Sequence, residues 1–423
     1  MTILDRRRFA LGLAALPGLA ATPADSILYP TTGPPMASWG AIARGGDGAV
    51  VFRGAAGQAY GPAGPRPFAL DQPFRVASVS KMIATAAFLP LAMRKGLDLD
   101  RDASDALGFR LRHPAHPDAA ITPRMLLSHV SGLRNGPSYP VPLGHRLAEA
   151  FTAEGRHYDG GAWFGPAEHR PGDWFAYADV NFALVAQMLE RLSGERFDRY
   201  LRRALFEPLG LDIGYNWSGV SQAKRARAAA GLHRVDGQWA PQVDGTVLPY
   251  PALPFTRPTD APGLTEADYK VGDNGFAFSP QGGLRLSVAD MDRLARMFAG
   301  HGQGVVPKAA LEAMQGPVWT YDPDHPNGEI DGGLLQSYGL GSEIPNGRPG
   351  PHGDAFFGAD SADWRGHFGD AYGWITGLFW NRRDGRTLVY AINGMPEMDR
   401  PPARNSSLTA PEAALIALAL PRS

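Results

Sequence analysis

Short apolar segments separated by turn residues occur near both ends of this chain. Ser38–Arg44 and Ala49–Gly54 are joined by Gly-Gly-Asp-Gly, and Gly373–Trp380 and Thr387–Asn393 are joined by Asn-Arg-Arg-Asp-Gly. Apolar runs connected by glycine and aspartate are typical of β-hairpins. We therefore expect one antiparallel sheet built from both chain ends.

The middle of the chain has a different pattern, with apolar residues at helical spacing between long Gly/Pro-rich loops. The segments with this periodicity are Ala120–Leu127, Val180–Leu192, Phe197–Leu205 and Val288–Ala299. A last helix is predicted over Pro411–Leu420, with Thr409 as its cap.

These patterns predict an α/β fold with flanking helices and an inserted, mostly helical domain. We expect the α/β domain to comprise residues 26–95 and 280–423, and the insert to comprise residues 96–279. Active sites often lie where two domains meet, so we expect the site at this junction.

Composition excludes several classes of function for this chain. The chain has 423 residues, of which 44% are hydrophobic and 20% charged, as in ordinary globular proteins. A net charge of -1 and a pI near 6.8 give no basic surface for nucleic acid. The absence of cysteine excludes disulfides, thiol catalysis and cysteine-ligated metals. His113 and His116 lie in a Pro-rich loop without a zinc motif, so neither a metal nor a cofactor is predicted.

The first residues have the pattern of an export signal. Asp5–Phe9 contains consecutive arginines, and the short apolar stretch Ala10–Leu16 follows. This pattern is typical of twin-arginine signals, whose partner is the twin-arginine export machinery. We expect residues 1–25 to be a signal peptide cleaved near Ala20–Ala24, and the protein to be periplasmic or secreted. An amphipathic N-terminus is the alternative, and no later run reaches the roughly 20 apolar residues of a membrane span.

The strongest chemical signal is Ser78 followed by Lys81 at the start of the apolar run Met82–Leu89. Positions i and i+3 share a helix face, so the lysine nitrogen can assist deprotonation of the serine hydroxyl. The first helical turn also favours a developing alkoxide and a neutral lysine. The same spacing recurs at Ser221 and Lys224 in a charged, solvated stretch, so we expect only Ser78 to be a nucleophile.

Two further segments carry candidate site residues. Tyr177 and Asp179 lie in the loop before the Val180 helix, where a phenol beside a lysine ammonium can shuttle protons. A buried core tyrosine is the alternative. His367 precedes a glycine-flanked strand and can line a substrate cleft, and a turn histidine at a sheet edge is the alternative.

These elements, in this order, resemble the serine β-lactamase and penicillin-binding-protein-like hydrolases, in the class C branch with D,D-peptidases, D-aminopeptidases and esterases. The motifs that carry the resemblance are Phe74–Lys81, Thr122–Leu133, Tyr177–Asp179, Gln281–Leu284 and His367–Gly369. The resemblance implies a β-lactamase/transpeptidase-like α/β fold.

Carried over by position, the resemblance implies that Ser78 is the nucleophile and that Lys81 and Tyr177 transfer protons. Which of the two takes the first proton stays open. The backbone N–H groups of Ser78 and Asp370 would form the oxyanion hole. The implied chemistry is two-step acyl transfer through a covalent Ser78 ester that water releases.

The resemblance also implies that Asp179, His367 and Gly369 contact the substrate, with His367 in the substrate wall. Asp179 replaces the family's usual asparagine, His367 replaces the lysine of true β-lactamases, and Asp370 adds a negative charge. These departures argue against anionic β-lactams and D-Ala-D-Ala termini, and favour neutral or amine-bearing substrates.

Two structural expectations follow. Asp179 should raise the pKa of Lys81, which would make Tyr177 the acceptor of the Ser78 proton. Pro90 should kink or end the catalytic helix about two turns beyond Lys81.

The sequence therefore predicts an exported serine hydrolase, esterase- or aminopeptidase-like, that acts on a small-molecule or peptide substrate. The alternative enzyme is a D,D-carboxypeptidase or a weak class C-type β-lactamase. A non-catalytic binding or sensor protein on the same fold is the alternative of another class.

Overall fold

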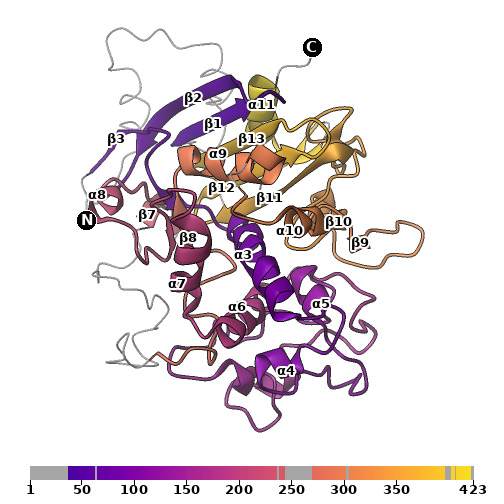
Figure 1. The fold of residues 1–423 in the computed structure, drawn as a ribbon. Helices are drawn as coiled ribbons and strands as arrows, with labels where there is room; N and C mark the ends of the chain where they lie inside the picture. The colour runs from indigo at the N-terminus through magenta and orange to yellow at the C-terminus, as the bar shows by residue number, and fades with distance from the viewer. Residues whose placement is uncertain are drawn as a thin grey trace, which may run out of the picture.

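The computed structural model describes residues 37–61, 64–235, 238–242, 269–301, 304–395, 402–404 and 406–420. The predicted signal peptide at residues 1–25 lies outside the described residues. A six-stranded antiparallel sheet dominates the upper part of the molecule in Figure 1. Its strands, in spatial order, are β11 (Trp364–Ala371), β12 (Trp374–Asn381), β13 (Thr387–Asn393), β1 (Ser38–Arg44), β2 (Val50–Ala59) and β3 (Arg66–Pro67).

The sheet joins the two ends of the chain, as predicted. Strand β1 pairs with β2 on one side and with β13 on the other, with Ser38 opposite Asn393 and Arg44 opposite Thr387. Both hairpins form where the turn residues placed them. The described part also contains short strands that lie outside this sheet: β4 (Phe74–Arg75), β5 (Gly214–Tyr215), β6 (Gly231–Val235), β7 (Gln238–Gln242), β8 (Leu284–Leu286), β9 (Trp319–Thr320), β10 (Ser337–Tyr338), β14 (Pro402–Ala403) and β15 (Ser406–Thr409).

The helices of the described residues are α3 (Val79–Lys95), α4 (Ser104–Leu107), α5 (Pro123–Leu127), α6 (Val180–Ser193), α7 (Phe197–Leu201), α8 (Gln222–Arg225), α9 (Val288–Arg296), α10 (Lys308–Ala313) and α11 (Ala410–Ala419). Thr122 caps α5 through its side chain, which accepts from the Met125 N–H, and Thr409 caps α11 in the same way. In the described part of the chain, none of the helices has the length and apolar character needed to cross a membrane.

Three predicted helices differ from the structure in extent or type. Helix α5 begins at Pro123 rather than Ala120, because Thr122 is already the cap. Helices α7 and α9 each continue as a π-helical turn, Arg202–Phe206 and Met297–His301. Pro90 was expected to kink or end the catalytic helix, and it does not end it, since α3 continues to Lys95 and ends at Gly96, whose φ is 64°.

Alternating side chains of the sheet pack into two cores. On β1, Ile42 belongs to the larger core, whereas Ala41 and Ala43 belong to the smaller one on the opposite face. Helices α3 and α9 supply the larger core, and α11 covers the other face with Leu415. The sheet is thus buried on both sides at β1, β11, β12 and β13, whereas β2 is exposed or half-buried over most of its length.

Helix α3 connects the sheet to the helical part of the molecule. It packs against β11 and β12 and against α6, and helices α4, α5, α6 and α7 lie below the sheet in Figure 1. The N-terminus of α3 lies close to the edge strand β11, because Gly369 approaches Val76 and Ala77. The domain boundaries at residues 96 and 279 stay a prediction.

Candidate active site

Ser78 lies at the start of α3, as its N-cap residue. Its side chain makes no capping hydrogen bond, so the hydroxyl is available for chemistry. The preceding residue, Ala77, is buried and has a φ of +53°, a left-handed conformation that costs a non-glycine residue about 1–2 kcal/mol. Val76 fixes this turn, since its N–H donates to the Leu284 carbonyl at 3.1 Å and its carbonyl accepts from Thr376 Oγ1 at 2.8 Å.

Lys81, one turn into α3, is fully buried and has three oxygen neighbours. Its Nζ lies 3.0 Å from Ser78 Oγ, 3.0 Å from the Gln281 carbonyl and 2.7 Å from Asp179 Oδ1. An ammonium would donate to all three. A neutral amine would donate to Gln281 and Asp179 and turn its lone pair toward the Ser78 hydroxyl.

Burial decides the direction of the Lys81 pKa. Desolvation lowers this pKa below its usual value, and the nearby carboxylates of Asp179 and Glu343 oppose that effect without reversing it. The contact expected between Asp179 and Lys81 therefore exists, and Asp179 raises the pKa of Lys81 as expected. Burial outweighs this effect, so the expectation that the net pKa of Lys81 is raised is wrong. A lysine with a lowered pKa is better suited to accept a proton near neutral pH.

Tyr177 lies on the other side of the nucleophile, with a half-buried side chain whose hydroxyl oxygen is buried. Its ring lies under the Lys81 nitrogen, 4.6 Å from Nζ to the ring centroid, and the Ser78 side chain is close enough to affect its pKa. Burial, followed by the charge of Asp179, raises the pKa of Tyr177 well above its usual value, and Ser78 only partly offsets this. The phenol is thus held protonated, contrary to the expectation that Tyr177 accepts the Ser78 proton.

His129 supports Tyr177 from behind. The two rings stack with centroids 4.4 Å apart. His129 Nδ1 accepts from the Ala178 N–H and from Asn181 Nδ2, both at 3.1 Å, which places the ring proton on Nε2. Ser131 donates to Asn181 Oδ1 at 2.7 Å, so the segment around His129 fixes the ring on which Tyr177 rests.

Asp179 is the N-cap residue of α6 and faces the cavity beside Ser78. Besides Lys81, its carboxylate accepts from the Tyr139 hydroxyl at 3.1 Å, and Gln281 Nε2 donates to that hydroxyl at 2.9 Å. Its side chain is 28% exposed. Asp179 is therefore both a partner of Lys81 and a wall of the site.

His367 differs from its expected place in the substrate wall. It lies within β11 rather than in a turn, and it is 1% exposed. Its Nε2 is 2.8 Å from the Tyr338 hydroxyl and its Nδ1 is 3.0 Å from Glu343 Oε1. Because side chains alternate along a strand, His367 points into the protein behind Tyr177, and its neighbour Phe368 lines the cavity instead.

The edge of β11 away from β12 approaches the nucleophile at Gly369. The Gly366 and Phe368 N–H groups both donate to Glu343, on the side away from β12, so the Asp370 N–H, two residues further, points to that same side. Gly369 permits a close approach, because a Cβ there would lie 2.3 Å from the Val76 carbonyl oxygen. Asp370 and Ser78 line the same cavities. The oxyanion hole formed by their N–H groups stays a prediction.

Two adjoining cavities of about 430 and 420 Å³ share Ser78, Asp179 and Asp370. The first also contains Arg75, Tyr139 and Gln281. The second is strongly acidic, and among the described residues that line it none is Lys or Arg. Its acidic residues are Asp179, Glu329, Asp331, Glu343 and Asp370.

The second serine-lysine pair has a structural role. Ser221 caps the short helix α8 by accepting from the Lys224 N–H, and its hydroxyl donates to Asp212 at 2.5 Å. The Lys224 ammonium pairs with Asp290 at 2.6 Å rather than with Ser221. The distinction drawn between the two pairs on sequence context is consistent with these contacts.

The family model for Beta-lactamase matches residues 38–410. The chain belongs to the β-lactamase family. Members of this family and its structural neighbours are serine hydrolases of the β-lactamase fold. The chain is 29% identical over 239 residues to Penicillin-binding protein 4 of Amycolatopsis lactamdurans, a match that covers 54% of this chain and 58% of that protein. The chain spans between 11% and 58% of the length of three curated relatives that it matches.

Solved structures show the same fold. The octameric penicillin-binding protein homologue from Pyrococcus abyssi has a TM-score of 0.62 at 20% identity, over 91% of this chain and 73% of that one. The D-amino acid amidase of Ochrobactrum anthropi SV3, complexed with D-phenylalanine, has a TM-score of 0.60 at 16% identity, over 94% and 97% of the two chains. These likenesses confirm the β-lactamase/transpeptidase-like α/β fold.

Several residues of the site were not singled out from the sequence. Glu343, Tyr338 and Tyr139 come from loops and short strands that carry no local motif. Gln281 and His129 lie within segments that resemble family motifs, but only the structure shows that the Gln281 carbonyl contacts Lys81 and that the His129 ring stacks on Tyr177.

Proposed function

We propose that this protein is an exported serine hydrolase that forms a covalent acyl-enzyme on Ser78, and that it prefers esters or amides bearing a free amine. The observation that carries the proposal is the acidic cavity beside Ser78, with carboxylates at its base and rim. A cationic substrate group would be attracted there, whereas a substrate carboxylate would be repelled. The fold likeness to a D-amino acid amidase agrees with this preference.

In this proposal Lys81, as the neutral amine, accepts the Ser78 proton while Oγ attacks the substrate carbonyl. The N–H groups of Ser78 and Asp370 stabilise the oxyanion. Tyr177, which is protonated at rest, donates its proton to the leaving group as the tetrahedral intermediate collapses. Water then attacks the Ser78 ester and gives a proton to the Tyr177 phenolate, and the Lys81 ammonium returns its proton to Ser78 Oγ as the acid is released.

The proposal is tested with paired chromogenic substrates. An aminoacyl p-nitroanilide or p-nitrophenyl ester with a free α-amine is compared with its N-acetyl counterpart, a D-alanyl-D-alanine peptide and a chromogenic cephalosporin. We expect kcat/KM to be at least about tenfold higher for the free amine, since even partly exposed charge pairs contribute up to about 1 kcal/mol each. Ser78→Ala should remove all turnover.

Two variants link the preference to the cavity. Glu329→Gln with Asp331→Asn should lower the ratio of free-amine to N-acetyl kcat/KM by about two- to fivefold, because two rim charges are lost. Glu312→Gln, which removes an exposed carboxylate of α10, is the matched control and should leave the ratio unchanged. A ratio near one in the wild type would refute the amine preference.

The other outcomes identify the alternatives. Fastest turnover of the D-alanyl-D-alanine peptide or the cephalosporin would support a D,D-carboxypeptidase or weak β-lactamase, which the match to a penicillin-binding protein also suggests. Stable acylation without turnover of any substrate would support a binding or sensor protein.

Export through the twin-arginine machinery rests on residues 1–25 alone. Arg6→Lys with Arg7→Lys should leave the precursor in the cytoplasm, because the export machinery recognises the arginine pair. Fractionation of cells that produce the wild type and the double variant measures this. Normal export of the double variant would contradict the proposed route.

A further inference from the structure

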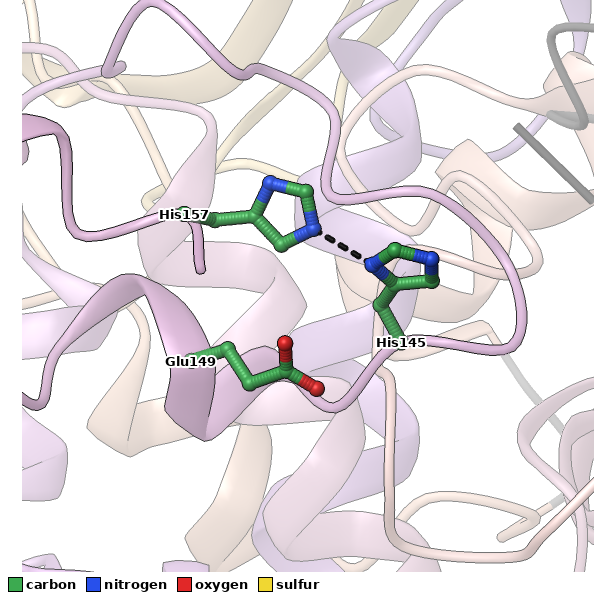
Figure 2. Close-up of side chains that lie close together, drawn as sticks. All are labelled: His145, Glu149 and His157. Carbon is green, nitrogen blue, oxygen red and sulfur yellow. Dashed lines mark hydrogen bonds between the residues drawn. The ribbon is translucent and has the colours of Figure 1, made fainter. Parts of the chain in front are cut away.

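A cluster of metal-ligand side chains lies away from the active site, in the segment between α5 and α6. The ligand atoms of His145, Glu149 and His157 all lie within 4.8 Å of one another. Figure 2 shows the two imidazoles facing each other and the Glu149 carboxylate turned toward the space beside them. We propose that these three side chains bind a divalent transition-metal ion with the ligand preferences of Zn²⁺.

The set of ligand atoms suits such an ion. Two imidazole nitrogens and one carboxylate are typical Zn²⁺ ligands, and water completes a tetrahedral site. His145 Nδ1 and His157 Nε2 are 2.6 Å apart. Bonds of about 2.0–2.1 Å to a tetrahedral ion separate ligand atoms by about 3.3 Å, so the two rings need to move apart by only about 0.7 Å.

The backbone holds the three ligand residues together before any ion binds. The His157 N–H donates to the Glu149 carbonyl at 3.2 Å, and the His157 carbonyl accepts from Trp163 Nε1 at 2.6 Å. Asn274 Nδ2 donates to the His145 carbonyl at 3.1 Å. Because Trp163 and Asn274 are buried, these bonds fix the spacing of the ligand residues. Little conformational entropy is therefore lost when an ion binds.

Groups around the cluster both favour and oppose the binding of a cation. Glu149 Oε1 accepts from the Arg146 N–H at 3.1 Å, which orients the carboxylate. The exposed Arg156 guanidinium lies 3.3 Å from His145 Nε2 and opposes a second cation.

A second histidine pair shows why this cluster is distinct. His113 and His116 also lie close together, but each Nε2 is already bonded to a main-chain carbonyl, that of Gly165 at 3.0 Å and that of Ala167 at 2.6 Å. In the His145 cluster the ring nitrogens face each other and a carboxylate instead. The cluster was not predicted from the sequence, since His145, Glu149 and His157 match no short metal motif.

The test uses the untagged protein, stripped with a chelator and titrated with Zn²⁺ against a chromophoric competitor. We expect one ion per chain, and visible absorption bands of a four-coordinate site when Co²⁺ replaces Zn²⁺. His145→Gln and Glu149→Gln should each weaken binding by about 100-fold or more, whereas Arg156→Ala should tighten it several-fold. Arg156 is exposed, so this last variant tests the site without risk to folding.

Two controls separate this site from others. His325→Gln, which removes a side chain that is 89% exposed, should not change Zn²⁺ affinity. Asp179→Asn tests whether the acidic active-site cavity binds the ion instead. Affinity unchanged by His145→Gln, or lost on Asp179→Asn, would overturn the proposal, as would the absence of Zn²⁺ binding in the wild type.

Discussion

Asp179→Asn is the sharpest test of how Lys81 is tuned. In the structure the Asp179 carboxylate lies 2.7 Å from the Lys81 nitrogen, and it is the main group that opposes the effect of burial on that amine. Asparagine keeps the shape and an acceptor oxygen but removes the charge. The pKa of Lys81 should therefore fall further, and the base should stay deprotonated to lower pH.

The magnitude follows from the geometry. Two unit charges 2.7 Å apart attract each other by about 6 kcal/mol at an effective dielectric of about 20, which is an upper bound for this pair. The Asp179 side chain is 28% exposed, so solvent screens part of this attraction. Opposite charges at such distances shift pKa values by about one to three, which corresponds to about 1.4–4 kcal/mol.

The assay is kcat/KM against pH for a neutral p-nitrophenyl ester, in which no substrate group titrates. The acidic limb reports the free enzyme's base, so it should move to lower pH by about one to three pH units in Asp179→Asn. Glu329→Gln removes a rim carboxylate of the same cavity without a Lys81 contact and is the matched control. A superimposable profile, a shift to higher pH, or an equal shift in the control would refute Lys81 as the base.

Three further predictions use other parts of the molecule. Ser78→Ala should abolish hydrolysis and labelling by a serine-directed phosphonate, whereas Ser221→Ala should cost about 1 kcal/mol of stability through its lost helix cap and leave both activities intact; an adduct mapped by mass spectrometry to another peptide would contradict the assignment. Tyr177→Phe should lower kcat by about 10²–10⁴ with little change in KM, as expected for loss of a general acid, and near-normal kcat would exclude that role. Burial raises the pKa of Glu190 from 4.5 to about 7, so the folded state holds this proton more tightly than the unfolded chain does. Its contribution to stability is thus complete below pH 4.5 and is lost as pH rises through about 7, by about 3 kcal/mol. Urea unfolding at about pH 5 and about pH 8 should show a smaller change in Glu190→Gln than in the wild type, and equal changes would contradict it.

Much of the fold was predictable because its determinants are local. The two terminal hairpins follow from turn residues between short apolar runs, and their pairing through β1 and β13 follows from the need to bury both. The ends of the helices were predicted less accurately. Thr122 and Pro123 start α5 later than periodicity alone suggests, and α3 continues past Pro90 because tertiary packing buries the helix as far as Ala92.

The site was predictable only where its residues form short motifs. Ser78, Lys81, Tyr177 and Asp179 are brought together as their motifs suggested. The partners that complete the site come from distant segments, such as the Gln281 carbonyl, which is 200 residues from Lys81 in sequence. No spacing rule connects such positions.

His367 shows a second limit of prediction from sequence, which is the face of the strand on which a side chain lies. A histidine beside Phe368 and Gly369 indicates that β11 borders the site, but in a strand only alternate side chains face one side. Which side is decided by the register with β12, where His367 lies opposite Leu378, a residue of the larger core. A shift of one residue would turn the imidazole toward the smaller core, where Phe368 now packs, and Phe368 toward the larger one.

The direction of proton transfer depends on a property that no single motif contains. Sequence neighbours identify the charges near Lys81 and favour an ammonium paired with Asp179. Burial instead results from the packing of α3, α6 and β11 together around the amine. It shifts the pKa values of Lys81 and Tyr177 in opposite directions, lowering that of Lys81 and raising that of Tyr177. Both shifts favour the neutral forms, an amine that can accept the Ser78 proton and a phenol that can give one to the leaving group. The same desolvation thus supplies a base and an acid on opposite sides of one hydroxyl.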